Sequence, residues 1–526
     1  MQLSGQQFIG YRRSNDHPTT FQALNPATGQ PLPGLFYAAS AREADEAMQL
    51  AAKAFEGYKN APGKFKAAFL IAIADEILAL GDVLIQRAMA ETALPQARLE
   101  GERGRTMSQL RLFAQYLEEG SWVEARIDPA LPERQPLPRP DLRNMLMPLG
   151  PVVVFGASNF PLAFSTAGGD TASALAAGCP VVVKAHPAHP GTSALVAGAI
   201  VAAAQKTGLP EGVFSMLFDE GYETGSALTK HPLARAVAFT GSQKGGMALY
   251  QLAQQRPDPI PVFAEMGSVN PVILFPKAVQ TRATSLATQL AASITLGVGQ
   301  FCTNPGLILA VETPELDGLL QQLGAAIEAA ASGVMLSAGI RENFSVSAAE
   351  MLQQQGVEMV GKSQNEATEH QAVPVIGKVI ATRFLKNPRL HEEVFGPFSL
   401  VVACVDETEL AQVIQALPGQ LTGTLMAELS EIESYAGIVQ LLQNKVGRLI
   451  FNGVPTGVEV GHAMQHGGPF PATTDPRFTS VGTAAIRRFV RPVAYQDFPD
   501  ALLPDALKRE NPLNIWRLVN GEWRKS

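Results

Sequence analysis

Short apolar runs alternate with helical stretches from about residue 150 onward, and this alternation constrains the fold more than any other feature of the chain. Four runs are expected strands: Val152–Phe155, Val181–Lys184, Val213–Leu217 and Ala236–Phe239. Helical patterns follow the first two runs, at Pro161–Ala177 and Ser193–Lys206. Continuous apolar strands are typical of a parallel sheet that helices cover on both faces. The pattern therefore predicts an α/β fold.

A second alternation of strand and helix starts near residue 270. Pro271–Phe275 and Leu307–Val311 are expected strands, and Arg282–Leu296 is an expected helix between them. We therefore predict a second α/β unit. The segment Asp128–Leu149 is rich in Pro and Arg, so it cannot be a compact helix. It is expected to be a linker or an extended arm, and the tail after Gly482 is expected to be extended as well.

The composition argues against several classes of protein. At 526 residues the chain is long enough for two or three domains. Its net charge is −7, from 41 basic and 48 acidic residues with no basic block, so we expect no nucleic acid partner. Gly and Pro interrupt the apolar stretches, so we expect no membrane association. Three cysteines without a CxxC spacing indicate a reducing compartment, taken as the cytoplasm, and no structural zinc.

Cys302 lies in the run Gly299–Gly306, GQFCTNPG, after an apolar helical stretch. A buried structural position is usual for a free cysteine, and we expect it for Cys179 and Cys404, which lie beside or inside apolar strands. Gly, Asn and Pro around Cys302 instead predict a tight turn, whose backbone N–H groups can stabilise a thiolate and then an oxyanion. Cys302 is therefore the candidate nucleophile.

Two polar residues at the ends of expected strands are candidates to act with this nucleophile. Glu265 ends an apolar run. It could be a solvated surface acid, but a semi-buried carboxylate there would have a raised pKa suited to a general base. Asn159 follows the strand that ends at Phe155, where a turn or N-cap asparagine is the alternative.

A glycine-rich turn follows the expected strand Ala236–Phe239. The sequence TGSQKGG at Thr240–Gly246 opens an expected helix, and a helix N-terminus favours a negative pyrophosphate. The pattern is not the GxGxxG of a classical dinucleotide site, and glycines in a turn are weak evidence by themselves. The turn is a candidate phosphate site only in combination with the other motifs.

Together with the string EEVFGP at 392–397, these motifs resemble the aldehyde dehydrogenase superfamily over roughly residues 20–500. The resemblance implies that Cys302 attacks an aldehyde and that Glu265 activates the water that releases the acid. It implies that Asn159 holds the oxyanion together with the Cys302 backbone N–H. The sequence departs from the family's Glu-Leu-Gly-Gly element, because Met266 and Ser268 replace Leu and the second Gly.

The resemblance also implies a fold of two Rossmann-type parallel-sheet domains with a small oligomerisation arm. The dinucleotide-binding domain would span 1–121 and 145–264, and the catalytic domain 265–484. The arm and tail would span 122–144 and 485–526. Edge strands in such an arm would be poor monomer surface, so a homodimer or homotetramer is expected.

Six residues match the cofactor site that the resemblance implies: Lys184, Gly241, Ser242, Gly246, Glu393 and Phe395. Many NAD-linked members carry a glutamate three residues after the lysine, and this chain has Pro187 there. Because no carboxylate would repel a 2′-phosphate, NADP is favoured over NAD. A bound metal is not expected. His462 and His466, spaced HxxxH, lack the glutamate of a zinc motif and are expected to line a loop near the substrate entrance.

Several longer strings resemble the branch of the superfamily that oxidises 2,5-dioxopentanoate (α-ketoglutarate semialdehyde) to 2-oxoglutarate in sugar-acid catabolism. They include GERGRT at 101–106, FAEMGSVNP at 263–271 and HGGPFPATTDPRFTSVG at 466–482. A broad-specificity or fatty aldehyde dehydrogenase using NADP, a CoA-acylating dehydrogenase and a non-catalytic structural protein are the alternatives.

The substrate of that branch carries a carboxylate far from its aldehyde, so the chain needs a cation at the end of an apolar tunnel. The candidate substrate residues are Arg105, Phe160, Phe164 and Thr303. Arg105 is the candidate cation because a planar guanidinium grips a carboxylate with two hydrogen bonds. Arg103 and Arg111 remain alternatives for that cation. Core packing is the alternative role for the two phenylalanines.

Overall fold

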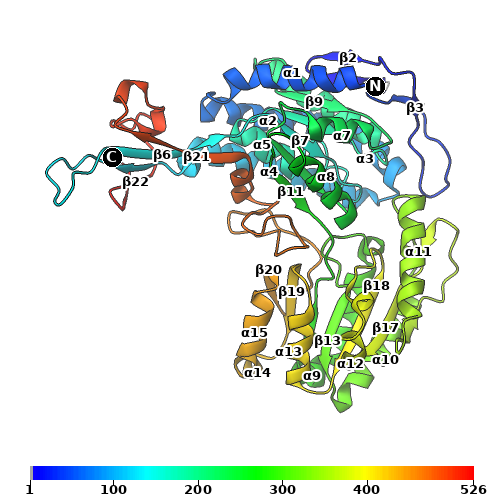
Figure 1. Ribbon diagram of the computed structural model, residues 1–526. Helices are drawn as coiled ribbons and strands as arrows, with labels where there is room; N and C mark the ends of the chain where they lie inside the picture. Colours follow the sequence, from blue (N-terminus) through cyan, green and yellow to red (C-terminus); the bar gives the residue numbers. More distant parts are fainter. Residues whose placement is uncertain (1–3, 526) are drawn as a thin grey trace.

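The computed structural model describes residues 4–525. The first of its two large sheets has seven strands (Figure 1). The strand order is β11 (Val262–Glu265), β10 (Ala236–Thr240), β7 (Val152–Phe155), β8 (Val181–Lys184), β9 (Phe214–Leu217), β1 (Gln7–Ile9) and β2 (Arg12–Ser14). The first five are parallel, and β1 and β2 add an antiparallel edge. The four strands expected from the apolar runs are therefore confirmed.

Helices cover both faces of this sheet, because alternate strand residues point to opposite sides. Val152 and Val154 of β7 pack into one core cluster and Val153 into another. The first cluster is closed by α2 (Gly63–Ala79), α3 (Gly81–Thr92), α4 (Gln96–Glu119), α5 (Gly169–Ala177) and α6 (Pro190–Lys206). The second is closed by α1 (Ala41–Tyr58), α7 (Glu223–Lys230) and α8 (Gln243–Gln254).

The segment expected as a helix from Pro161 begins its helix only at Gly169, and that prediction is wrong for the first eight residues. The buried Glu102 carboxylate accepts hydrogen bonds from the backbone N–H groups of Leu162 and Ala163, at 2.8 and 2.9 Å. These bonds hold the chain in turns next to α4. A side chain far away in sequence therefore decides the local structure here.

The second layer is another seven-stranded sheet, parallel except at its β15 edge. Its order is β15 (Glu358–Lys362), β17 (Val375–Ile380), β18 (Phe398–Cys404), β13 (Leu307–Val311), β12 (Val272–Leu274), β19 (Gln420–Met426) and β20 (Val446–Phe451). On one face lie α9 (Pro276–Thr295) and α10 (Pro314–Ala329). On the other lie α11 (Ala338–Leu352), α12 (Ala381–Phe384), α13 (Glu407–Ala416) and α15 (Ala436–Gln443). Helix α9 starts six residues before its expected start at Arg282, where its backbone is irregular.

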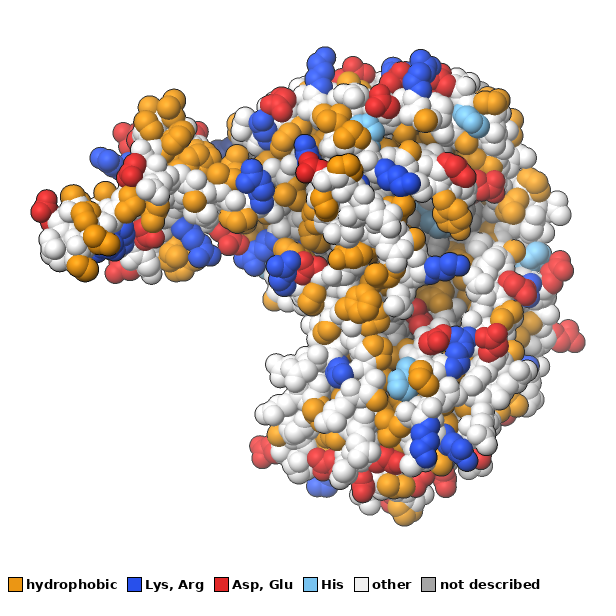
Figure 2. Space-filling view, viewed as in Figure 1, with side chains coloured by type: hydrophobic (Ala, Val, Ile, Leu, Met, Phe, Trp, Pro, Cys, Tyr) orange, Lys and Arg blue, Asp and Glu red, His pale blue; other side chains and the backbone are white. Residues whose placement is uncertain are grey.

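A third sheet of five strands projects from the body of the molecule (Figure 1). Its order is β21 (Val490–Gln496), β6 (Leu142–Pro148), β5 (Arg126–Asp128), β22 (Arg517–Val519) and β23 (Glu522–Arg524). The Pro- and Arg-rich segment thus forms an extended arm that pairs with the tail. Several large apolar side chains are exposed on this projection, and hydrophobic groups are visible along it in Figure 2.

The first sheet joins the second at the end of strand β11. Strand β11 of the first sheet ends at Glu265, and the chain then passes directly into the second unit. The segment 452–482 runs between the two sheets, and its Ala472 carbonyl accepts a 2.8 Å hydrogen bond from the Met266 N–H. The end of β11, the loop before β13 and the 452–482 segment therefore converge.

Candidate active site

Cys302 lies on a loop that buried hydrogen bonds hold in place. The loop follows α9 through a short 3₁₀ turn and packs so closely that a Cβ on Gly299 would lie 2.2 Å from the Gly396 carbonyl oxygen. The side-chain amide of the buried Asn270 donates 2.9 Å hydrogen bonds to the carbonyls of Cys302 and Asn304. The predicted tight turn is confirmed. Asn270 is a supporting residue that no sequence pattern indicated.

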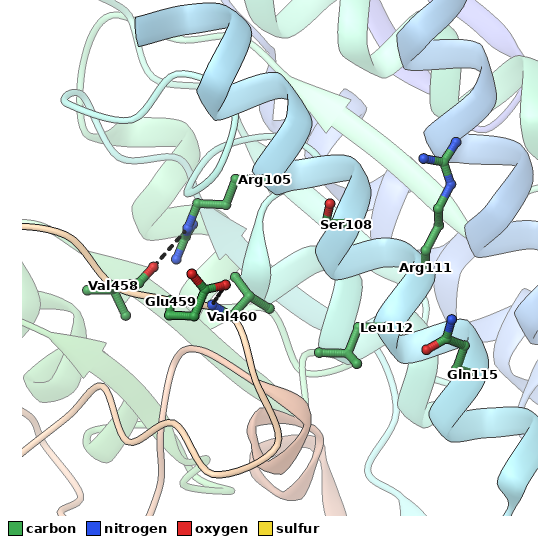
Figure 3. A pocket seen from close by; sticks show the side chains of 8 residues that line it. All are labelled: Arg105, Ser108, Arg111, Leu112, Gln115, Val458, Glu459 and Val460. Atoms are coloured by element: carbon green, nitrogen blue, oxygen red, sulfur yellow. Dashed lines mark hydrogen bonds between the residues drawn. The ribbon is translucent and has the colours of Figure 1, made fainter.

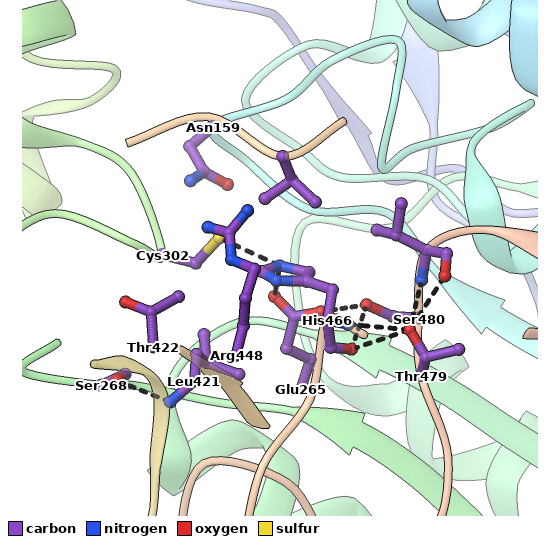
Figure 4. Close-up of polar contacts among 12 residues, drawn as sticks. Asn159, Glu265, Ser268, Cys302, Leu421, Thr422, Arg448, His466, Thr479 and Ser480 are labelled. Carbon is purple, nitrogen blue, oxygen red and sulfur yellow. Dashed lines mark hydrogen bonds and ion pairs between the residues drawn. The ribbon is translucent and has the colours of Figure 1, made fainter. Parts of the chain in front are cut away.

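Three reactive side chains meet around this loop: Cys302, Glu265 and His466 (Figure 4). Cys302 Sγ lies 3.4 Å from His466 Nε2 in a hydrogen bond, and the same nitrogen lies 2.8 Å from Glu265 Oε1. The angles at this second contact fall outside hydrogen-bond geometry, so Oε1 has no hydrogen-bond partner among the described residues. Cys302 and Glu265, selected from segments 37 residues apart, are thus brought together.

His466 is not at an entrance loop, as the sequence suggested, but is buried at the centre of the site. Its backbone N–H donates to the Thr479 hydroxyl at 2.8 Å, and its ring packs against the Phe164 ring, with 6.1 Å between the two centroids. His462, four residues earlier, is exposed and bonds to Thr483. The HxxxH spacing does not distinguish the two histidines, because only the path of the 452–482 segment buries one of them.

The Glu265 carboxylate is buried, but the direction of its pKa shift is opposite to our expectation. Burial alone would raise the pKa of Glu265, whereas His466 and the Ser480 hydroxyl, which donates to Oε2, together lower that pKa below its usual value. The sequence showed an acid at the end of an apolar strand but not these two partners, which come from a segment some 200 residues away. A lowered pKa keeps the carboxylate ionised at neutral pH but makes it a weaker base than an ordinary glutamate.

The thiol of Cys302 shifts in the other direction. Burial, and then the negative charge of Glu265, raise the pKa of Cys302 well above its ordinary value. The other two cysteines, Cys179 and Cys404, are fully buried as expected. Cys302 is the one of the three that is partly accessible, and it needs a base to lose its proton.

Asn159 lies beside this cluster at the turn that follows β7 (Figure 4). Its side-chain Nδ2 donates one hydrogen bond, of 3.1 Å, to the carbonyl of Gln300, two residues before the cysteine. The guanidinium of Arg98 donates to the Asn159 carbonyl at 3.3 Å. Because Nδ2 has a second proton, the amide is still able to donate to an oxyanion formed near Cys302.

The expected cofactor residues occupy the carboxyl edge of the first sheet and the join to the second. Lys184 ends β8 and its Nζ donates 2.6 Å to the Asp219 carbonyl; burial lowers the pKa of Lys184 to about 8. Gly241 and Ser242 open α8, and the Ser242 hydroxyl caps that helix by accepting from the Gly245 N–H. At Gly246 a Cβ would lie 2.7 Å from the Met266 sulfur, so only glycine lets α8 approach β11.

Glu393 belongs to the second unit but reaches the end of β11. A Cβ on Gly267 would lie 2.2 Å from its Oε2, so glycine leaves the space for this carboxylate. Burial raises the pKa of Glu393 to about 7. Phe395, two residues on, is half-buried beside it in sequence. A helix N-terminus, a buried lysine and this carboxylate on one edge fit the phosphates and riboses of a dinucleotide.

Arg105 lines a cavity of about 520 Å³ on α4 (Figure 3). Its Nε donates to the Val458 carbonyl at 3.3 Å, while Nη1 and Nη2 are buried without partners. Arg103 instead donates to the Gly81 carbonyl, and the half-buried Arg111, which lines the same cavity, pairs with Asp75. Of the three arginines considered, Arg105 alone has both terminal nitrogens buried and unpaired among the described residues.

Aromatic rings connect this arginine to the nucleophile. The Arg105 guanidinium lies 5.0 Å from the centroid of Phe164, which packs on His466. Phe160 lies edge-on to Phe164 at 5.2 Å and to Phe301 at 5.6 Å. The two phenylalanines are thus adjacent, although no helix carries them. Thr303 is buried next to Cys302 in the chain.

A thiol, an imidazole and a carboxylate within 4.8 Å of one another are also groups that can bind a metal ion. The expectation that the protein uses no metal stays a prediction. The same three groups are equally suited to passing a proton between a nucleophile and a base.

These residues form the candidate active site, and comparison with known proteins shows the class to which the chain belongs. The family model described as "Aldehyde dehydrogenase family" matches residues 11–469, and the chain belongs to that family. A protein named alpha-ketoglutaric semialdehyde dehydrogenase 2 from Azospirillum brasilense is 53% identical over 99% of this chain and its own whole length. An alpha-ketoglutaric semialdehyde dehydrogenase from Acinetobacter baylyi is 49% identical over 98% of both chains.

Solved structures share the fold. A betaine aldehyde dehydrogenase from Staphylococcus aureus in complex with NAD⁺ has a TM-score of 0.80 and 19% identity, over 94% of this chain and 96% of that one. A 1-pyrroline-5-carboxylate dehydrogenase has a TM-score of 0.78 and 21% identity, over 93% and 92%. Both confirm the predicted α/β architecture. Within residues 4–525 no helix has the length and apolar character that crossing a membrane requires.

Proposed function

We propose that this chain oxidises 2,5-dioxopentanoate to 2-oxoglutarate with NADP or NAD as the hydride acceptor. The observation that carries the proposal is the Arg105 side chain, which lines a cavity on α4, has no hydrogen bond at its two buried terminal nitrogens among the described residues, and packs on Phe164 next to His466. A buried cation without a partner is costly unless a ligand supplies the anion. The two relatives at about half identity carry the name of this activity.

The reaction that these groups support starts at the thiol. Cys302 Sγ adds to the aldehyde carbon as its proton leaves, and the Asn159 amide donates to the oxygen that becomes negative. The thiohemiacetal collapses to a thioester with loss of hydride, and accepting that hydride is the chemistry that a bound nicotinamide supplies. Glu265 then takes a proton from water, which attacks the thioester and releases the acid and the thiol.

Cofactor binding is proposed for Lys184, Gly241, Ser242, Gly246, Glu393 and Phe395. Their positions along the end of β8, the start of α8 and the join to the second unit support this assignment. We propose NADP as the preferred cofactor, because Pro187 leaves no carboxylate where a 2′-phosphate would lie and the amine of Lys184 is nearby in the chain.

We also propose a role for each of the three regions of the chain, from its place in the fold. Residues 1–121 and 145–264 would bind the dinucleotide, and 265–484 would carry the nucleophile. Segments 122–144 and 485–526 would join copies of the chain into a dimer or tetramer, since the projecting sheet exposes large apolar side chains such as Leu137 and Trp523. Three free cysteines favour the cytoplasm.

Product analysis tests the proposal and separates it from the alternatives. The enzyme is incubated with 2,5-dioxopentanoate and either cofactor, with and without CoA, and the product is identified by mass spectrometry. Free 2-oxoglutarate in both cases is expected, because Glu265 activates water. A CoA thioester would show an acylating dehydrogenase instead, and equal rates with long neutral aldehydes would favour the broad-specificity alternative.

A further inference from the structure

We propose that Arg98 is a positioning residue that holds Asn159 in place relative to the nucleophile loop, so that the Asn159 amide and the Cys302 backbone N–H donate to the same oxyanion. The inference deepens the proposed function, because it concerns the site in which that reaction would take place. Within residues 4–525 no hydrogen bond or ion pair joins Arg98 to Cys302 or to Glu265. Arg98 therefore acts through its neighbours.

Two aromatic rings connect Arg98 to the segments that carry the donors. Its guanidinium carbon lies 4.7 Å from the ring centroid of Phe160 and 4.5 Å from that of Phe301. Phe160 directly follows Asn159 in the chain, and Phe301 directly precedes Cys302. The two rings also meet edge to face, with 5.6 Å between their centroids. Because the face of an aromatic ring attracts a cation, the guanidinium holds both segments against α4.

A hydrogen bond joins the guanidinium to Asn159 itself. Nη2 of Arg98 donates to the Asn159 backbone carbonyl at 3.3 Å. The Asn159 side-chain Nδ2 donates to the Gln300 carbonyl at 3.1 Å. The backbone of Asn159 is therefore held to α4, while its amide is held to the nucleophile loop. Together these two bonds fix the direction in which the second proton of Nδ2 points.

Helix α4 is a fixed support for this contact. Glu102, one turn after Arg98, holds the turns that follow Asn159 through its Oε1, and its Oε2 pairs with Nη2 of Arg98 at 3.8 Å. On the other side lies the turn that leads into the nucleophile loop. A Cβ on Gly297 in that turn would lie 3.3 Å from Nη1 of Arg98. The guanidinium thus fills the space between the two segments that carry the donors.

Positioning of this kind predicts a distinct kinetic behaviour. Two donors stabilise a developing negative charge together only if both lie at hydrogen-bond distance from the same oxygen. The placement of Asn159 therefore matters while its amide is present and stops mattering once that amide is removed. The oxyanion forms from any aldehyde, so the effect of Arg98 is also independent of a carboxylate at the far end of the substrate.

A double-mutant cycle in a single turnover measures this behaviour. The rate of reduced-cofactor formation is followed by absorbance for the wild type, Arg98→Met, Asn159→Ala and the double variant. We expect Arg98→Met to lower this rate roughly ten-fold and Asn159→Ala to lower it roughly a hundred-fold or more. The double variant should lie within about two-fold of Asn159→Ala, because Arg98 then has no amide to place.

Two aldehydes and a matched control complete the design. Pentanal and 2,5-dioxopentanoate should show the same fold-loss in Arg98→Met. Arg13→Met is the control and should keep the wild-type rate, because Arg13 also lies over an aromatic ring and donates to a backbone carbonyl, but at the β2 edge of the first sheet, opposite β11. Thermal melting checks folding. Arg98→Gln, which keeps a polar side chain at this partly exposed position, gives the same comparison if the methionine variant does not fold.

Several outcomes overturn the proposal. An unchanged rate in Arg98→Met, or losses that multiply in the double variant, would show that Arg98 does not act through Asn159. A loss confined to 2,5-dioxopentanoate would show that Arg98 binds the substrate carboxylate. Unfolding of both Arg98 variants would show a role in the fold alone. Failure of the proposed function looks different: the wild type would oxidise pentanal as fast as 2,5-dioxopentanoate, while the cycle on pentanal would still couple Arg98 to Asn159.

Discussion

The guanidinium of Arg105 lies 5.0 Å from the centre of the Phe164 ring, and its two terminal nitrogens make no hydrogen bond within the described chain. Burial lowers the pKa of Arg105, but an arginine keeps its charge at neutral pH even so. A cation held in this way, with an aromatic face on one side and a cavity on the other, is suited to a ligand carboxylate.

Replacing Arg105 with Ala should raise KM for 2,5-dioxopentanoate while sparing a neutral aldehyde of similar length. The loss corresponds to about 2–4 kcal/mol if the carboxylate pair is buried. Steady-state kinetics on both aldehydes measure it, with Arg12→Ala as the control because Arg12 pairs with Glu46 on the surface and does not line the cavity. Equal losses on the two aldehydes would mean that Arg105 supports the fold and not the ligand.

Replacing Glu265 with Gln should slow thioester hydrolysis more than thioester formation. The neutral amide cannot accept a proton from water, so an acyl-enzyme on Cys302 should accumulate after one turnover. Rapid quenching and mass spectrometry of the intact protein detect the added mass, and Cys302→Ser, which should lose several powers of ten in rate, shows no adduct. Unchanged steady-state turnover in the glutamine variant would remove Glu265 from the mechanism.

NADP binding should weaken as the pH rises through about 8, the value to which burial lowers the pKa of Lys184. The amine is charged below this pH and neutral above it, so its attraction for a 2′-phosphate is present on the acid side and lost on the alkaline side. NAD, which lacks that phosphate, should change less. Fluorescence titrations of both cofactors between pH 7 and pH 9 measure the difference, and parallel curves would show that Lys184 does not meet the phosphate.

The chain should be a dimer or tetramer at micromolar concentration. The five-stranded sheet projects from the body and carries exposed apolar side chains, including Trp523 at 62% exposure and Leu137 at 69%. Burying such side chains against a second copy is favourable. Sedimentation velocity measures the mass directly. A single monomeric boundary at this concentration would contradict the assigned role of the arm.

Local patterns were sufficient to predict the strands and the turn around Cys302. The continuous apolar runs specify β7 and β8, and the GQFCTNPG string specifies the turn around Cys302, because both depend on neighbouring residues in the chain. His466 could not be assigned in this way. Its burial depends on where the 452–482 segment passes between two sheets, and His462 in the same segment is exposed.

Long-range contacts explain the other differences as well. The turns before α5 depend on Glu102 of α4, more than 50 residues earlier. The lowered pKa of Glu265 depends on His466 and Ser480, which no pattern around residue 265 indicates. Sequence reasoning thus selected the candidate nucleophile and the candidate base, while the side chains that contact them could be found only in the folded chain.

The central claim is that the site selects an aldehyde with a distal carboxylate, and a substrate panel tests it most directly. The measurement is kcat/KM of the wild-type enzyme for 2,5-dioxopentanoate and for pentanal, a neutral aldehyde of the same chain length, at saturating NADP and again at saturating NAD. The account predicts a preference for 2,5-dioxopentanoate of roughly 30-fold or more with either cofactor, the ratio that about 2 kcal/mol of carboxylate recognition gives. Equal kcat/KM values for the two aldehydes would contradict it.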